Sequence, residues 1–314
     1  MMKDNKKMLF IVKRFGRLAN RIVLFANVIA FAEEKGYQVV NVSFHSYAHF
    51  FEGTDDTLLC AYPRKKCPLD LFGLRSVIYR WIRKSRILYQ ATYMLSKLLI
   101  SLGLSGTFLT FITDTAQEQP ILFSSPAMEE KIEKAKIVLL SGWTVRDSGN
   151  VEKHAEKIRA FFTPIKKYAD AIEARMDEFK EGCDLLVGVH IRQGDYRNWL
   201  GGSYYYSLEQ YVQRMHGIQD LYDGRRIKFL LCSDSEVRGE KFPGLTVAES
   251  KGTPLEDLYS LARCDMIMGP PSTFSQWASF YGNVPLWHVT DPDQSVKKEN
   301  FTISSIGYIP GHDK

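Results

Sequence analysis

Short apolar runs alternate with helix-length segments along most of this chain of 314 residues. Near the N-terminus, residues 8–12 form a short apolar run, residues 20–35 have apolar positions at helical spacing up to Gly36, and 37–42 form a second short run. This order predicts a strand–helix–strand unit with two parallel strands. We therefore expect an α/β protein with mostly parallel sheets and helices on both faces.

The same alternation begins again near Cys183. Strands are predicted at 185–191, 227–232, 266–268 and 285–289, and helices at 207–218, 254–263 and 273–281. Two Rossmann-like halves, joined near 165–182, predict two domains, 1–165 and 166–314, with a cleft between them.

Composition excludes several classes of protein. Hydrophobic residues make up 45% and charged residues 25%, which is typical of a globular protein and not of a disordered or fibrous one. The net charge of +5 is mild, and we expect no nucleic-acid partner. The five cysteines are widely spaced without a CxxC pair, which favours a reducing compartment over a disulfide framework or structural zinc. The apolar run 8–12 is too short for a signal-peptide core, so we expect a cytoplasmic protein.

Residues 71–113 differ most from the rest of the chain. No acidic residue occurs between Asp70 and Asp114. The basic residues of this stretch are Arg75, Arg80, Arg83, Lys84, Arg86 and Lys97. Apolar residues at helical spacing predict a basic helical insert, and its residues 74–102 are typical of a helix that lies peripherally on an anionic membrane face. The alternative is an insert that packs on its own domain and solvates its basic face.

Charged residues follow the predicted strand 185–191 directly. The strand ends with His190 and is followed by Arg192, and the chain then turns through Gly194 into Asp195. In open α/β sheets, ligands bind beyond the carboxyl ends of the strands. Arginine suits a phosphate because it is always charged and can bind two oxygens at once. The segment therefore predicts an anion site, with an Arg–Asp pair that merely closes a turn as the alternative.

Two further strand ends carry polar residues. Ser272, Thr273 and Ser275 lie at the start of the predicted helix 273–281, where free N–H groups and the helix dipole favour an anion. Simple N-capping explains these residues equally well. Asp234 follows the strand 227–232 and is expected either to bind a nucleoside or to cap the next segment. The aromatic residues of the last helix are better explained as core: Phe274, Trp277 and Phe280.

Several well-known motifs are missing from the sequence. The loop 13–21 lacks G-x-G-x-x-G, so NAD binding is disfavoured. The sequence also lacks Walker A, HExxH, G-x-S-x-G and an Asp-x-Asp pair for a metal-bridged diphosphate. We therefore expect no metal and no cofactor.

The segments, taken in this order, resemble the superfamily of α-1,2-, α-1,6- and protein O-fucosyltransferases, and above all the bacterial α-1,2-fucosyltransferases of glycosyltransferase family eleven. The matching segments are 16–21 (GRLANR), 141–144 (SGWT) with 158–162, 189–196 (VHIRQGDY), 229–234 (FLLCSD), and 256–265 with 272–277 (STFSQW). They reach from about residue 9 to about residue 290, although 43–135 match nothing in the family.

The resemblance implies a GT-B fold, with two facing Rossmann-like domains and GDP-fucose bound chiefly to the C-terminal one. It also implies inverting, metal-independent transfer of fucose to a hydroxyl of a glycan, free or lipid-linked, in bacterial surface polysaccharide or O-antigen assembly, with an α-1,2 linkage favoured.

The resemblance also assigns roles to single residues. Arg192 would hold the β-phosphate, and His190 and Asp234 would contact the nucleoside. The segment Ser272, Thr273, Phe274 and Ser275 would cradle the diphosphate. In the N-terminal domain, Asn20 would face the cleft as a catalytic residue and Arg17 would contact the donor.

The general base is assigned less directly. An acceptor hydroxyl needs a base within hydrogen-bond reach, and Asp195 is the candidate. Its alternative role is an ion pair with Arg192 or Arg197 that shapes the loop. Lesser candidates for the base are Arg17, Asp147 and Glu256.

Three departures from the family pattern leave alternatives open. Gln193 replaces a second arginine, Ala19 replaces a glycine, and Pro270-Pro271 removes two N–H donors before the phosphate loop. A transferase of another GDP-sugar is one alternative. A non-catalytic nucleotide- or carbohydrate-binding protein of the same fold is the other.

Overall fold

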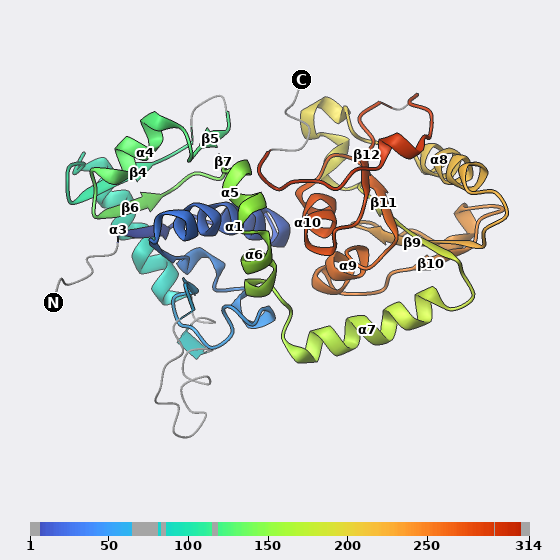
Figure 1. Ribbon diagram of the computed structural model, residues 1–314, viewed down its shortest axis with the longest axis horizontal. Helices are drawn as coiled ribbons and strands as arrows, with labels where there is room; N and C mark the ends of the chain where they lie inside the picture. The colour runs from blue at the N-terminus through green and yellow to red at the C-terminus, as the bar shows by residue number, and fades with distance from the viewer. Residues whose placement is uncertain (1–6, 65–80, 83–85, 115–118, 292, 309–314) are drawn as a thin grey trace. The chain divides into compact units, whose positions relative to one another are not determined.

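The computed structural model describes residues 7–64, 81–82, 86–114, 119–291 and 293–308, which form two compact units (Figure 1). The first unit takes in the residues up to Lys166 and the segment from Ile306, and the second takes in Lys167–Ser305. The division therefore lies beside the predicted boundary of 165/166. The return of the segment from Ile306 to the first unit was not predicted.

The first unit is built on a sheet with the strand order β3-β2-β1-β6-β4 among the described residues. All neighbouring strands are parallel except β2 and β3. The strands are β1 (Met8–Ile11), β2 (Gln38–Val40), β3 (Ala61–Tyr62), β4 (Leu109–Ile112) and β6 (Ile137–Leu140). A separate parallel pair joins β5 (Ile121–Leu122) to β7 (Val145–Arg146).

Helix α1 (Leu18–Lys35) is the centre of the first unit, because every residue from Ile22 to Ala32 is buried. Its Asn27 donates a hydrogen bond of 2.9 Å to the Ile306 carbonyl and accepts one of 2.8 Å from the Asp147 N–H. These bonds satisfy a buried amide and fix the returning C-terminal segment. The other helices of this unit are η1 (Val42–Phe44), η2 (Ala48–Phe50), α3 (Ile87–Ser101), α4 (Pro126–Glu133), α5 (Ser148–Lys153) and α6 (Ala155–Phe161).

The second unit is built on a parallel sheet with the order β10-β9-β8-β11-β12. Its strands are β8 (Leu185–Ile191), β9 (Ile227–Ser233), β10 (Val247–Glu249), β11 (Met266–Gly269) and β12 (Leu286–His288). In chain order this arrangement is 3-2-1-4-5, which is the order of a doubly wound Rossmann sheet. The order reverses between β8 and β11, and ligands of such sheets bind in the crevice at this switch point.

Helices cover both faces of the second sheet (Figure 1). On one face, α8 packs Tyr211 and Met215 against Val187 and Val189 of β8. On the other face, Gly188 lies so close to Leu261 that a Cβ would come within 2.5 Å of its methyl group. The helices are α7 (Lys166–Lys180), η3 (Asp195–Arg197), η4 (Trp199–Gly202), α8 (Leu208–Leu221), η5 (Gly239–Lys241), α9 (Pro254–Leu261), α10 (Thr273–Gly282) and η6 (Lys298–Asn300).

The predicted fold class is confirmed: both units are α/β with mostly parallel sheets. The prediction of a helical insert over 71–113 is wrong at its C-terminal end, because residues 109–112 form β4, a strand parallel to β6. Within this stretch, residues 71–80 and 83–85 lie outside the described residues, and α3 occupies Ile87–Ser101. No helix in the described part of the chain has the length and apolar character needed to span a bilayer.

Gly282 fixes the position of α10. A Cβ at this residue would lie 1.9 Å from the Ala262 carbonyl oxygen, which is backbone and cannot rotate away. Gly282→Ala is therefore expected to lower the free energy of unfolding by about 1–3 kcal/mol, the usual cost of overpacking. Urea unfolding followed by circular dichroism measures it. The control is Gly149→Ala in α5, where a Cβ meets nothing within 4 Å; equal stability of the two variants would contradict the close packing.

Candidate functional site

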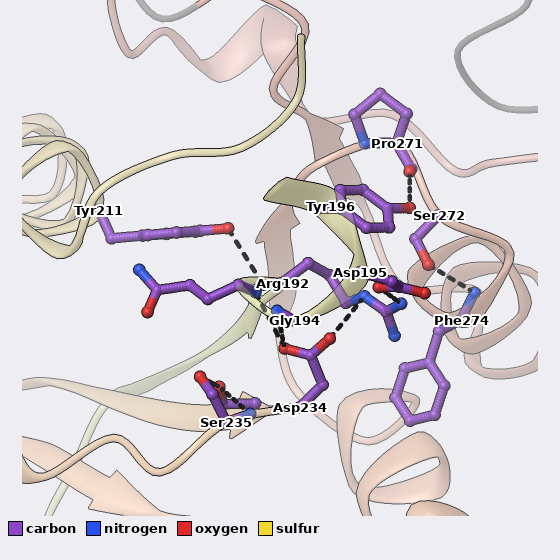
Figure 2. Close-up of polar contacts among 12 residues, drawn as sticks. Arg192, Gly194, Asp195, Tyr196, Tyr211, Asp234, Ser235, Pro271, Ser272 and Phe274 are labelled. Atoms are coloured by element: carbon purple, nitrogen blue, oxygen red, sulfur yellow. Dashed lines mark hydrogen bonds and ion pairs between the residues drawn. The ribbon is translucent and has the colours of Figure 1, made fainter. Parts of the chain in front are cut away.

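Three loops meet at the switch point of the second sheet (Figure 2). The loops follow β8, β9 and β11 and carry Arg192, Asp195, Asp234 and Ser272. His190 lies near the end of β8 itself, and Thr273, Phe274 and Ser275 form the first turn of α10. The strands are parallel, so their carboxyl ends share one edge of the sheet. The structure thus brings together all the predicted site residues of the second unit.

Arg192 is held on three sides. Its Nε lies 3.3 Å from the Asp234 Oδ2, and its Nη2 forms an ion pair with Asp195. Its guanidinium lies over the ring of Tyr196, 4.8 Å from the centroid, a cation–π contact. The arginine side chain is 14% exposed and that of Asp195 is 55% exposed. Arg192 is therefore a preorganised cation whose outer partner is accessible to solvent.

Asp234 shapes the loop that carries Arg192. Its Oδ1 accepts hydrogen bonds from the N–H groups of Gln193 (2.9 Å) and Gly194 (3.2 Å). A Cβ at Gly194 would lie 2.9 Å from the Oδ2 of the same carboxylate, so a side chain there would push it away. Both carboxylate oxygens thus contact the protein, and Asp234 positions Arg192 whether or not it also contacts a ligand.

His190 is buried beneath the loops. Its ring stacks on Phe274 with 4.9 Å between centroids, and its Nδ1 has no hydrogen-bond partner among the described residues. Burial, followed by the charge of Arg192 and the neighbouring His288, holds the pKa of His190 well below its usual value. His190 is therefore neutral at pH 7, and a buried ring nitrogen is left for a ligand or a water molecule.

Helix α10 begins at the same place. Ser272 is its N-cap and accepts a hydrogen bond of 3.2 Å from the Phe274 N–H, as the capping interpretation predicted. The Ser275 hydroxyl donates to the Ser272 carbonyl (3.2 Å) and lies 3.4 Å from the His288 Nε2. Of the three aromatic residues expected in the core, Trp277 and Phe280 are buried, whereas Phe274 is only half-buried.

Tyrosines complete the site, and none of them was predicted. Tyr196 donates a hydrogen bond of 2.5 Å to the Pro271 carbonyl, and burial raises its pKa to about 12, so it remains a donor. Tyr211 accepts a hydrogen bond of 3.5 Å from the Arg192 N–H. Tyr206 accepts one of 3.2 Å from the Gln193 side chain through its carbonyl. The one sequence signal for Tyr196 is its place directly after Asp195.

A pocket of about 600 Å³ opens beside Asp234, beyond the ends of β9 and β10. Its polar lining includes Ser233, Ser235, Glu236, Glu249 and Ser250. The volume lies within the range of small-molecule sites. The arrangement can therefore hold an anion at Arg192 and a polar group in the adjoining pocket.

The predicted residues of the first unit form a separate group after β1. Gly16 has a φ of +56°, and a Cβ there would lie 2.0 Å from the Asn20 Nδ2, so the loop folds directly onto this amide. Arg21 donates hydrogen bonds of 3.3 and 3.1 Å to the Gly16 carbonyl. Arg17 is exposed at the N-terminus of α1, and Ala19 is buried. The Asn20 amide therefore packs against the backbone of Gly16.

The two lesser acidic candidates for the base have structural roles. Asp147 is buried, accepts a hydrogen bond of 2.8 Å from Asn150 at the start of α5, and has its pKa raised by burial. Glu256 completes the capping box of α9 by accepting a hydrogen bond of 2.6 Å from the Thr253 N–H. The side chain of Asp195 forms an ion pair with Arg192, and 55% of it is exposed.

No family model matches the chain, and no curated protein matches it. Solved structures do. FUT1 of Arabidopsis thaliana in complex with GDP matches with a TM-score of 0.55 and 11% identity over 95% of this chain and 73% of that one. The fucosyltransferase NodZ from Bradyrhizobium matches with a TM-score of 0.54 and 18% identity, over 93% of this chain and 98% of that one. POFUT1 in complex with GDP-fucose matches with a TM-score of 0.54 and 11% identity, over 90% of this chain and 95% of that one.

The fold is that of known fucosyltransferases. The resemblance noted in the sequence therefore predicted the correct fold. Its narrower assignment to the α-1,2 family remains a prediction, because NodZ is described as an α-1,6-fucosyltransferase. In the described part of the chain, no three His, Cys, Asp or Glu residues are grouped so as to hold a metal ion.

Burial of His288 makes stability depend on pH. Burial lowers the pKa of His288 from 6.5 to about 4, so the unfolded chain takes up its proton first as pH falls. The free energy of unfolding should therefore decrease between pH 6.5 and 4, by about 3 kcal/mol for this residue. His288→Gln should reduce that decrease in urea unfolding at a series of pH values. Parallel curves for variant and wild type would show that His288 is not buried in its neutral form.

Proposed function

We propose that the chain is a fucosyltransferase that transfers fucose from GDP-fucose to a glycan hydroxyl. The observation that supports it best is the preorganised Arg192 at the switch point of the second sheet. Solved structures of this fold include complexes with GDP and with GDP-fucose. A fixed arginine at that position suits a diphosphate, because its fork of N–H donors matches phosphate oxygens.

The remaining donor contacts are assigned from the site chemistry. The N-terminal segment of α10, with Ser272, Thr273, Phe274 and Ser275, contributes backbone N–H groups and the positive end of the helix dipole to the diphosphate. The pocket beside Asp234 receives the nucleoside, and its lining includes the carboxylates of Glu236, Glu240 and Glu249, which suit a base that carries N–H donors. The Oε1 of Glu249 already accepts a hydrogen bond from the Gly239 N–H, so its Oε2 is the oxygen assigned to the base. Guanine has paired donors on one edge, which favours GDP over UDP.

The reaction breaks the bond between the anomeric carbon of fucose and the β-phosphate oxygen and forms one from that carbon to the acceptor oxygen. Negative charge then develops on the GDP leaving group, where Arg192 and the α10 N–H groups stabilise it. Asp195 takes the proton from the acceptor hydroxyl as general base. A donor phosphate competes with Asp195 for the Arg192 Nη2, so that donor binding releases this carboxylate for the acceptor.

The finer assignments rest on the sequence. An α-1,2 linkage, an acceptor from bacterial surface polysaccharide and a role for Asn20 and Arg17 follow from the motif resemblance, and a cytoplasmic location from the cysteine pattern. Another GDP-sugar as donor is the second candidate. It is favoured by Gln193, whose amide donates to the Tyr206 carbonyl at 3.2 Å and adds no charge. A panel of GDP-sugars with product mass and linkage analysis separates these possibilities.

Arg192→Ala tests the phosphate contact. GDP should raise the melting temperature of the wild type in the presence of EDTA, UDP should do so much less, and the variant should lose most of the GDP shift. Removal of a buried charge-assisted contact costs about 2–5 kcal/mol, so affinity should fall at least about thirtyfold.

The matched control is Arg226→Ala. Arg226 forms a similar ion pair with Asp184 at 2.7 Å, but before β9, at the opposite edge of the same sheet. In Arg226→Ala, GDP should raise the melting temperature as much as it does in the wild type. An undiminished GDP shift in Arg192→Ala would remove Arg192 from the donor site.

Asp195→Asn tests the general base. The variant should bind GDP as tightly as the wild type or more tightly, because a competitor for Arg192 has lost its charge. Its kcat for fucosyl transfer should fall about 100-fold or more, the usual contribution of a general base. Isothermal titration with GDP and a transfer assay measure the two effects, with Asp184→Asn as the matched control. Unchanged kcat in Asp195→Asn would assign the base to another residue.

A further inference from the structure

Helix α3 of the first unit exposes its apolar residues instead of burying them. Within Ile87–Ser101 the buried residues are Tyr89 and Ser96, whereas Met94 is 64% and Leu98 53% exposed. The exposed apolar residues on the helix and in the loop that follows are Ile87, Met94, Leu95, Leu98, Leu102, Leu104 and Phe108. Met94, Leu98 and Leu102 are four residues apart and share one face. We call these seven residues the α3 patch.

A pocket of about 690 Å³ lies beneath the α3 patch. Its floor is one face of the first sheet, formed by Phe10, Val12, Leu139 and neighbouring strand residues. Its walls come from α3 and the following loop, with Leu99 and Leu104 among them, and none of its lining residues is charged. The patch and the pocket together form one continuous apolar region, which is unusual on a protein surface without a partner.

Basic residues lie on and beside this apolar region. Arg86 is exposed at the N-terminus of α3, and Lys97 is exposed on the helix itself. The guanidinium of Arg14 lies over the ring of Tyr89, 4.5 Å from its centroid. The sequence contains no acidic residue from 71 to 113. An occupant of the region must therefore tolerate an apolar surface and complement a basic one.

We propose that the α3 patch binds the surface of a bilayer that contains anionic lipid. The helix would lie in the plane of the interface, with Met94, Leu98 and Leu102 inserted among the acyl chains and with Arg86 and Lys97 at the headgroups. The pocket beneath it accepts an acyl chain. This inference is independent of the proposed function, because α3 belongs to the first unit and the donor site is assigned to the second.

The same chemistry disfavours a second copy of the chain as the occupant. A symmetric dimer through α3 would gather four positive charges, Arg86 and Lys97 of both copies, at one apolar interface, and residues 71–113 offer no acidic partner for them. Like charges facing each other across an interface are costly, whereas an anionic leaflet neutralises them.

Flotation of the full chain with vesicles tests the proposal. The wild type should float with vesicles of phosphatidylcholine and phosphatidylglycerol, less with phosphatidylcholine alone, and less at high salt. Leu98→Glu and Met94→Glu should reduce binding about tenfold or more, because each places a charge in the apolar interface. Lys97→Gln should reduce binding to the anionic vesicles about fivefold.

The matched control is Leu122→Glu. Leu122 is an exposed leucine of the same unit, 49% exposed on β5, outside the α3 patch. Its flotation should equal that of the wild type, and thermal unfolding should show that all variants are folded. Wild-type protein that does not float, or Leu98→Glu that floats as well as the wild type, would overturn the proposal. So would a dimer in sedimentation without vesicles that Leu98→Glu abolishes, because a second copy would then be the occupant.

Discussion

The contacts of the Asp234 carboxylate hold the candidate site together. It follows β9 and accepts two backbone N–H groups of the loop after β8, at Gln193 and Gly194, while its second oxygen holds the Arg192 Nε. A carboxylate that accepts backbone hydrogen bonds and pairs with an arginine makes charge-assisted bonds, which are stronger than neutral ones. One side chain thus fixes both the course of the loop and the direction of its cation. A side chain at Gly194 would come within 2.9 Å of the same carboxylate, so this close packing requires glycine.

Burial beneath this loop keeps His190 and Tyr196 neutral. His190 loses its proton at physiological pH because it is desolvated and lies near Arg192, and Tyr196 keeps its proton for the Pro271 carbonyl because burial raises its pKa. Arg192 is therefore the cation with which Asp195 and Asp234 form ion pairs. An anion at this point would meet one fixed positive charge and would compete for it with the exposed carboxylate of Asp195.

The sequence predicted the elements whose signal is local. The run Leu185–Ile191 is buried throughout and apolar except for His190, so its predicted limits coincide with those of β8. The Ser272 cap predicted the start of α10 to the residue. Contacts that depend on register were not predictable. Asp234 meets the loop after β8 because His190 pairs with Cys232 and Ile191 with Ser233, and no local pattern encodes this alignment. Strand β4 was taken for the end of a helical insert because its four residues adjoin a long basic helical pattern.

The electrostatics of the Arg192 cluster connect donor binding to catalysis. Without a ligand, one guanidinium faces two carboxylates, and these differ in exposure: the side chain of Asp234 is 12% and that of Asp195 is 55% exposed. A solvated carboxylate gives up an ion pair at small cost, because water replaces the lost contact, whereas a buried one does not. Under the proposed function, an arriving diphosphate would therefore displace Asp195 and leave Asp234 in place. The displaced carboxylate would then lie beside the leaving group, where the acceptor hydroxyl has to lose its proton. In that proposal Arg192 would serve both as the phosphate ligand and as the group that holds the base until the donor is bound.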